Sequence, residues 1–144
     1  VGYTEDYDFE IGKAVWLREA QKVTFISAGT TVGHCLKAAT ALEEDGINVG
    51  LLNMHTVKPL DREAIADTVD ISDMIFVVDE HTRIGGLGSA ITDHIVEHHG
   101  MGVRLFCHGI DDRYVETGNY PFLLHKNGLD AAGIEAFIRT KLAL

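Results

Sequence analysis

The chain has 144 residues, and its 22 acidic against 12 basic side chains give a formal net charge of −10. This balance excludes most proteins that bind nucleic acid or anionic membranes, because phosphate groups repel an acidic surface. A hydrophobic content of 46% and a charged content of 24% predict one soluble globular domain, and no apolar run reaches the roughly 20 residues of a membrane span.

Apolar residues recur along the chain with the periods of strands and helices. In chain order, the pattern predicts a short strand at 14–17, a strand at 23–28, a helix at 30–45, a strand at 47–53, a helix at 62–69, a strand at 74–78, a helix at 89–99, a strand at 103–106, a helical turn at 120–125 and a helix from 130 to 142.

Capping residues mark the ends of several predicted helices. Thr30 or Thr31 can cap the first helix, and Gly46 lies where a helix commonly stops. Asp61 and Asp130 can cap the second and the last helix in the same way. These three helices therefore have a chemical reason to begin or end where the apolar period does.

Strands that alternate with helices, and that are apolar on both faces, are typical of a mostly parallel sheet covered on both sides. We therefore predict a doubly wound, three-layer α/β/α domain. In such sheets, functional sites form where loops leave the carboxyl ends of the strands. Those loops are predicted at 28–31, 53–60, 79–88 and 107–117.

Two further features indicate the cellular context. Cys35 and Cys107 are too few for a disulfide framework, so we expect a reducing compartment and a cytoplasmic protein. The chain starts at Val1 with an acidic stretch that lacks the basic and apolar regions of a signal peptide. We expect a piece of a longer protein, either a processed product or an excised domain.

A glycine-rich turn follows one predicted strand and opens a helix. Its glycines are Gly85, Gly86 and Gly88, which would let backbone N–H groups and a helix N-terminus approach an anion. The dinucleotide and mononucleotide fingerprints are both incomplete here. The alternative is a tight connection between strand and helix with no ligand.

Two arrangements of histidine raise a zinc hypothesis. His94-Ile-Val-Glu-His98 matches the His-x-x-Glu-His pattern of inverted zincins, although no third ligand is identified by spacing. A packed imidazole at the edge of an apolar stripe is the alternative. The pairs His34–Cys35 and Cys107–His108 fit no structural zinc spacing, and buried structural thiols are the alternative there.

Charged residues follow two neighbouring strands. Asp79, Glu80 and His81 end one strand, and Asp111, Asp112 and Arg113 follow the next. Together they could perform acid–base chemistry or grip a phosphorylated ligand. The alternative is a salt-bridged cluster that holds two loops or a subunit contact. His81 is the residue that we would test first.

Three loops taken together carry a family resemblance. They read Asn53-Met-His-Thr-Val-Lys-Pro-Leu-Asp61, then Glu80-His81 with Ile84-Gly-Gly-Leu-Gly-Ser-Ala90, then Gly109-Ile-Asp-Asp-Arg113 with Glu116-Thr-Gly118. In order and spacing they resemble the C-terminal domain of the transketolase family, which is thiamine-diphosphate-dependent. Within this family, the sequences of these loops are most similar to those of transketolase itself. Deoxyxylulose-phosphate synthases and the β chains of 2-oxo acid dehydrogenases are alternative branches.

The resemblance implies a fold and a division of the chain. The family fold is a three-layer α/β/α sandwich with about five strands, of which the first is antiparallel to the others. Residues 1–13 resemble the linker from a preceding domain, and residues 14–144 the transketolase C-terminal domain itself. The implied partners are the pyrimidine- and diphosphate-binding domains or subunit of the same enzyme, in a homo-oligomer.

The resemblance also implies what this chain lacks. The family holds the diphosphate and its Mg²⁺ with a Gly-Asp-Gly motif in another domain, and no Gly-Asp-Gly occurs here. We therefore expect no catalytic, cofactor-binding or metal-binding residue in this chain. The complete enzyme would transfer a two-carbon ketol unit between sugar phosphates. Glu80, His81, Gly85, Gly86, Gly88, Asp112 and Arg113 match the family motifs and are expected at an interface or anion site. A stand-alone anion-binding module is the rival hypothesis.

Overall fold

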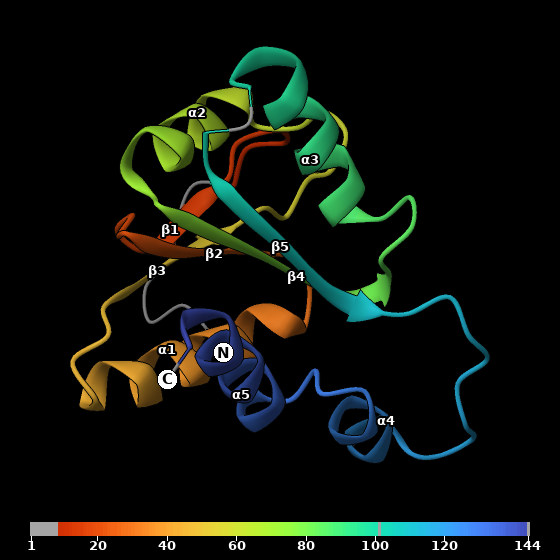
Figure 1. Ribbon diagram of the computed structural model, residues 1–144. Helices are drawn as coiled ribbons and strands as arrows, with labels where there is room; N and C mark the ends of the chain where they lie inside the picture. The colour runs from red at the N-terminus through yellow and green to blue at the C-terminus, as the bar shows by residue number, and fades with distance from the viewer. Residues whose placement is uncertain (1–8, 101, 144) are drawn as a thin grey trace.

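The computed structural model describes residues 9–100 and 102–143 (Figure 1). Its strands are β1 Val15–Arg18, β2 Val23–Ser27, β3 Val49–Asn53, β4 Met74–Thr82 and β5 Arg104–Ile110. Its helices are α1 Thr31–Glu44, α2 Arg62–Ile71, α3 Leu87–His98, α4 Tyr120–Lys126 and α5 Ala131–Leu142. No helix in these two ranges is long and apolar enough to cross a membrane.

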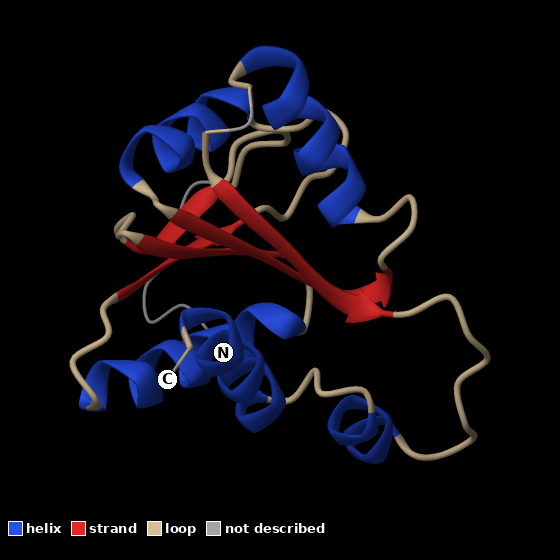
Figure 2. Ribbon diagram, viewed as in Figure 1, coloured by secondary structure: helices blue, strands red, loops and turns tan. Residues whose placement is uncertain are grey.

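The five strands form one sheet in the order β1-β3-β2-β4-β5. β1 runs antiparallel to β3, and every other neighbouring pair is parallel. Helices α2 and α3 lie on one side of the sheet, and α1, α4 and α5 lie on the other (Figure 2). The expected three-layer α/β/α sandwich with an antiparallel first strand is therefore confirmed.

Two apolar layers, one on each face of the sheet, form the core. Phe25 and Phe76 pack with α1 and α5, and their ring centroids lie 6.3 Å apart in an edge-to-face arrangement. Ile26 and Ile75 face the opposite way and pack with α2 and α3. Because side chains alternate along a strand, β2 contributes to both layers, and all of its residues are buried.

Two of the predicted caps are confirmed and one is wrong. The carboxylates of Asp61 and Asp130 accept hydrogen bonds from the first turns of α2 and α5. Thr30 precedes α1 with a helical backbone and no capping hydrogen bond. The hydroxyl of Thr31 instead donates to the carbonyl oxygen of Ala28 at 2.8 Å, so it is engaged with the chain that precedes the helix.

β4 and β5 are both longer than predicted. β4 continues to Thr82 and β5 to Ile110, so residues 79–81 lie inside a strand rather than after it. The two strands stay paired beyond an irregularity in β4, and the Arg83 N–H donates to the Ile110 carbonyl at 3.0 Å. Their polar side chains are exposed or half-buried, which is why the apolar pattern ends before the strands do.

One carboxylate joins the antiparallel edge strand to the second helix. Asp61 accepts from the Ala64 N–H at 3.2 Å through Oδ1, and from the Ala14 N–H at 2.7 Å through Oδ2. Asp61 is only 6% exposed. The entry to β1 and the start of α2 therefore depend on the same side chain.

We expect Asp61→Ala to lower the free energy of unfolding by about 2–4 kcal/mol, because it removes a helix cap and leaves a partly buried amide without an acceptor. Urea denaturation followed by circular dichroism measures the change. Asp67→Ala, an exposed substitution on the same helix, is the control and should change stability by less than about 0.5 kcal/mol. Equal effects of the two substitutions would contradict the assignment.

Candidate functional site

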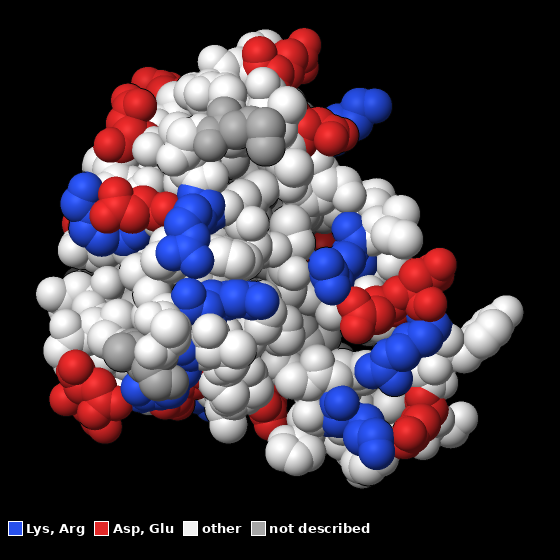
Figure 3. All heavy atoms as spheres, in the orientation of Figure 1, with Lys and Arg blue, Asp and Glu red and all other residues white. Residues whose placement is uncertain are grey.

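The carboxyl ends of β4 and β5 border an open cleft. Its volume is about 480 Å³. Figure 3 shows side chains of both charges crowded over this end of the molecule, at the right of the view. The lining residues are Arg83, Ile84, Ser89, Thr92, Asp93, Cys107, Asp111 and Asp112.

Backbone N–H groups of the glycine-rich turn donate hydrogen bonds to side chains of the same chain. The Leu87 N–H, at the start of α3, donates to the carboxylate of Asp79 at 3.3 Å, and the Gly85 N–H donates to the Ser89 hydroxyl at 2.9 Å. Gly86 allows this tight turn, because a Cβ there would lie 2.7 Å from the Thr82 carbonyl oxygen and 3.2 Å from the Asp79 carboxylate. A negative group of the protein therefore already occupies the N-terminus of α3, which supports the tight-turn alternative over anion binding.

Gly88 has a packing reason of its own. A Cβ at this position would lie 2.7 Å from the sulfur and 3.1 Å from the Cβ of Cys107. The absence of a side chain at Gly88 therefore lets α3 lie directly on β5. This requirement comes from helix–strand packing and involves no ligand.

The side chains of Glu80 and His81 lie in different environments. The Glu80 carboxylate accepts a short hydrogen bond from the hydroxyl of Tyr120. The Thr30 hydroxyl lies within hydrogen-bonding distance of the same phenol oxygen. Desolvation and the hydrogen bond to Glu80 raise the pKa of Tyr120. The His81 side chain is exposed and makes no hydrogen bond with the described residues.

Tyr120 is a residue that the sequence analysis missed. It connects α4 to the end of β4 and the start of α1, although 40 positions separate it from Glu80. A weak local signal was present, because Asn119 precedes it and caps α4 by accepting from the Phe122 N–H at 3.0 Å. That signal predicts the helix but cannot predict its docking partner.

Asp112 and Arg113 also separate. Asp112 lines the cleft beside the glycine-rich turn. Arg113 reaches the other way and donates to the Asn127 side chain at 2.8 Å, at the end of α4. The neighbouring ion pair joins Arg83 to Asp111 at 2.8 Å. This arrangement supports the loop-cluster alternative, since these charges hold the β4 and β5 ends and α4 in place.

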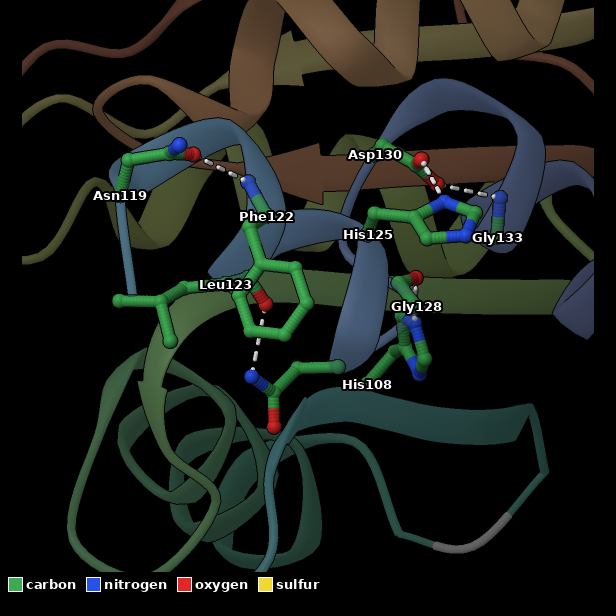
Figure 4. Close-up of polar contacts among 9 residues, drawn as sticks. His108, Asn119, Phe122, Leu123, His125, Gly128, Asp130 and Gly133 are labelled. Atoms are coloured by element: carbon green, nitrogen blue, oxygen red, sulfur yellow. Dashed lines mark hydrogen bonds and ion pairs between the residues drawn. The ribbon is translucent and has the colours of Figure 1, made fainter. Parts of the chain in front are cut away.

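The junction between α4 and α5 contains a half-buried histidine (Figure 4). The Nε2 atom of His108 donates to the carbonyl oxygen of Gly128 at 2.7 Å. Its ring stacks on Phe137 with centroids 4.3 Å apart. His125 and the cap residue Asp130 form an ion pair at 2.8 Å in the same junction. Desolvation lowers the pKa of His108, and the hydrogen bond to Gly128 opposes that shift in part.

Neither zinc hypothesis gains support. His94 is 8% exposed, as the packed-imidazole alternative expects, and burial followed by the nearby His98 lowers its pKa. Cys35 and Cys107 pack in opposite layers of the core. Burial raises the pKa of Cys35 to about 12. Among residues 9–100 and 102–143, no group of three or more His, Cys, Asp or Glu side chains is placed to hold a metal ion.

The family model described as "Transketolase, C-terminal domain" matches residues 12–134. The chain belongs to the transketolase C-terminal domain family. The resemblance of the three loops to this family is thereby confirmed.

Relatives of this transketolase C-terminal domain include a transketolase subunit and a 1-deoxy-D-xylulose-5-phosphate synthase. One subunit of the apulose-4-phosphate transketolase of Phocaeicola vulgatus is 38% identical over 130 residues, which cover 90% of this chain and 41% of that protein. 1-Deoxy-D-xylulose-5-phosphate synthase 1 of Geobacter sulfurreducens is 39% identical over 138 residues, which cover 93% of this chain and 22% of that protein. The chain therefore spans less than half of either relative.

One solved structure is similar to this chain over its full length. The structure, described as "Split gene transketolase, inactive beta4 tetramer", is 30% identical in sequence and superimposes with a TM-score of 0.89. The match covers 100% of this chain and 46% of that chain. The transketolase C-terminal domain described here thus has the fold of one part of a longer polypeptide.

The contact between Gly88 and Cys107 predicts a measurable difference between two glycines. Gly88→Ala should lower the free energy of unfolding by about 1–3 kcal/mol, because the added methyl group overlaps Cys107. Gly33→Ala in α1 is the matched control, since a Cβ there meets nothing within 4 Å. It should raise stability by about 0.5–1 kcal/mol. Denaturant melts in which both variants behave alike would refute the packing account.

His108 predicts a pH dependence of stability. The native state holds the neutral imidazole and the unfolded chain binds a proton near the ordinary pKa of 6.5, so stability is retained above about pH 6.5 and falls below it. His108→Gln, which keeps an N–H donor but cannot titrate, should flatten this fall without abolishing it, because the pKa of His94 is also lowered. Urea melts between about pH 5 and 8 test this. An NMR titration giving His108 a pKa above 6.5 would disprove it.

Proposed function

We propose that this chain is the C-terminal section of a transketolase-type enzyme, in which it supports subunit assembly and active-site architecture without supplying catalytic groups. The complete enzyme transfers a two-carbon ketol unit between sugar phosphates. One observation carries the proposal. The polar side chains best placed for chemistry at the carboxyl edge, including Asp79, Glu80 and Arg83, bind other groups of the same chain.

A deoxyxylulose-phosphate synthase is the second candidate for the complete enzyme. The 39% identity to a synthase of Geobacter sulfurreducens supports it as strongly as the 38% identity to a transketolase subunit supports the first candidate. Both candidates give this domain the same role, because both relatives contain a much larger part that this chain does not represent. Measuring which donor substrate the complete enzyme uses would distinguish the two candidate activities.

The cofactors implied for the complete enzyme are thiamine diphosphate and Mg²⁺, and the described residues do not fit the diphosphate. Diphosphates prefer free backbone N–H groups and basic side chains. Here Asp79 already holds the start of α3, and three further carboxylates line the adjoining cleft, from Asp93, Asp111 and Asp112. We therefore assign the cofactor to the other domains of the enzyme.

The proposed partners are the pyrimidine- and diphosphate-binding domains, either in the same polypeptide or in a separate subunit, and the assembly is a homo-oligomer. Every residue from 111 to 122 is exposed, and Tyr114, Val115 and Phe122 are among the large apolar side chains at the surface. Exposed aromatic groups on an ordered segment are typical of protein contacts. The two free cysteines fit a cytoplasmic enzyme.

We expect no heat of binding when thiamine diphosphate and Mg²⁺ are titrated into this chain alone, and no ketol transfer by the chain alone. Ketol transfer should arise when the chain is mixed with the section of a transketolase that carries the other two domains. Isothermal titration calorimetry and a coupled transfer assay measure the two results. Stoichiometric cofactor binding to the isolated chain would refute the proposal.

A further inference from the structure

α3 carries a buried histidine beside a cleft that it shares with α2. The two helices contact each other on one face of the sheet, at the top of the view in Figure 1. Ala90, His94 and Glu97 follow one another at helical spacing along α3 and line a cleft of about 630 Å³. Arg62 of α2 and residues 57–60 of the preceding loop line the same cleft. Because only 8% of the His94 surface is exposed, its ring is packed at this cleft and not free in solvent.

The neutral form of the His94 ring suits this packed position. Its Nε2 atom is buried and has no hydrogen-bond partner among the described residues. A neutral imidazole carries one N–H, so Nε2 is free of a proton when that proton is on Nδ1. A protonated imidazole carries an N–H on both nitrogens. Nε2 would then be a buried donor on a charged ring without an acceptor, which disfavours the charged form in this position.

The positive groups around the ring act in the same direction. The ring centroids of His98 and His99 lie 4.5 Å and 5.7 Å from that of His94. Burial, followed by the effects of His98, of Arg62 on α2 and of His99, lowers the pKa of His94. Lys58, in the loop before α2, adds a further positive charge to the lining of the cleft. The packed ring is therefore held neutral from both helices and from the loop.

The cleft itself offers better surroundings for a charged ring. The carboxylates of Asp93 and Glu97 line it, from positions just before and one turn after His94 on α3. Glu97 opposes the lowering of the pKa of His94, and its carboxylate lies 3.5 Å from Nε2 of His98. A ring turned into the cleft would therefore gain water and two anionic neighbours.

We propose that His94 is an acid-operated switch, in which the neutral ring stays packed beside α2 and the protonated ring turns out into the cleft toward Asp93 and Glu97. The first side-chain torsion of a helical residue has two favoured values, so the ring has two discrete orientations and the backbone of α3 need not move. Acidification thereby changes the shape and the charge of the surface between α2 and α3. The inference goes beyond the proposed function and does not depend on it.

The test follows the His94 ring by NMR in the full chain between about pH 5 and 8, in the presence of a soluble, uncharged gadolinium chelate. The chelate speeds the relaxation of protons that are exposed to solvent. The His94 ring protons should be protected at the upper pH and should relax severalfold faster at the lower pH, with a midpoint below 6.5. The methyl groups of Ile134, which is buried in the other apolar layer, should stay protected throughout.

Two variants of the cleft should move this midpoint in opposite directions. Arg62→Gln should raise it by about 0.3–1 pH unit, because the charged ring loses a like charge nearby. Glu97→Gln should lower it by a similar amount, because the charged ring loses an opposite charge. Lys37→Gln and Glu44→Gln make the same changes in charge at exposed positions of α1, on the other face of the sheet. These controls should move the midpoint by less than about 0.2 pH unit.

His98→Gln gives a second test that leaves α2 untouched. It removes the neighbouring imidazole whose effect on the pKa of His94 is second only to burial, so the midpoint should rise. Far-ultraviolet circular dichroism at both ends of the pH range establishes that the chain and each variant are folded.

A His94 ring that gains a proton while its relaxation by the chelate stays low would overturn the proposal, because the charged ring would then remain buried. So would a midpoint that Arg62→Gln and Glu97→Gln leave unchanged or move in the same direction. Loss of the circular dichroism signal of the chain over the same pH range would also overturn it, since unfolding would then release the ring. None of these outcomes bears on the proposed function, which the ketol transfer assay tests separately.

Discussion

β2 lies between β3 and β4 and is buried on both faces along its whole length. A strand that is buried on both faces must be covered by a layer of helices on each side of the sheet. The two core clusters built on Phe25 and Ile26 provide this cover. The parallel pairing also sends the ends of β2, β3 and β4 to the same edge. The candidate residues Glu80 and His81 lie at this edge because of that alignment, and the parallel pairing of β4 with β5 brings Asp112 and Arg113 to the same edge.

Parallel strands place polar loops side by side at their carboxyl ends, and several polar side chains of these loops contact groups of the same domain. Asp79 holds the start of α3, the Tyr120 hydroxyl joins Glu80, and Arg113 reaches Asn127 at the end of α4. A group that stabilises a neighbour in this way is poorly suited to bind a ligand, because binding would first break the existing contact. At this edge, which carries active sites in many α/β proteins, the contacts of Asp79, Tyr120 and Arg113 help to hold α3 and α4 in place.

The apolar pattern predicts the buried strands well, since β2 and β3 lie in surroundings that favour apolar side chains. The caps Asp61 and Asp130 were equally predictable, because a cap acts on the next three residues. The ends of β4 and β5 were not, since exposed strand residues obey no apolar period. The contact of Tyr120 with Glu80, and the crowding of Gly88 by Cys107, depend on how distant elements cross, and no local pattern encodes that.

The exposed segment 111–122 is attached to the body of the domain mainly through polar contacts, such as those of Arg113 and Tyr120, and its apolar side chains face outward. Its amino-acid sequence is therefore under little constraint from folding. Substitutions in this segment can therefore be accepted without loss of the core, so its surface can change while the fold stays the same.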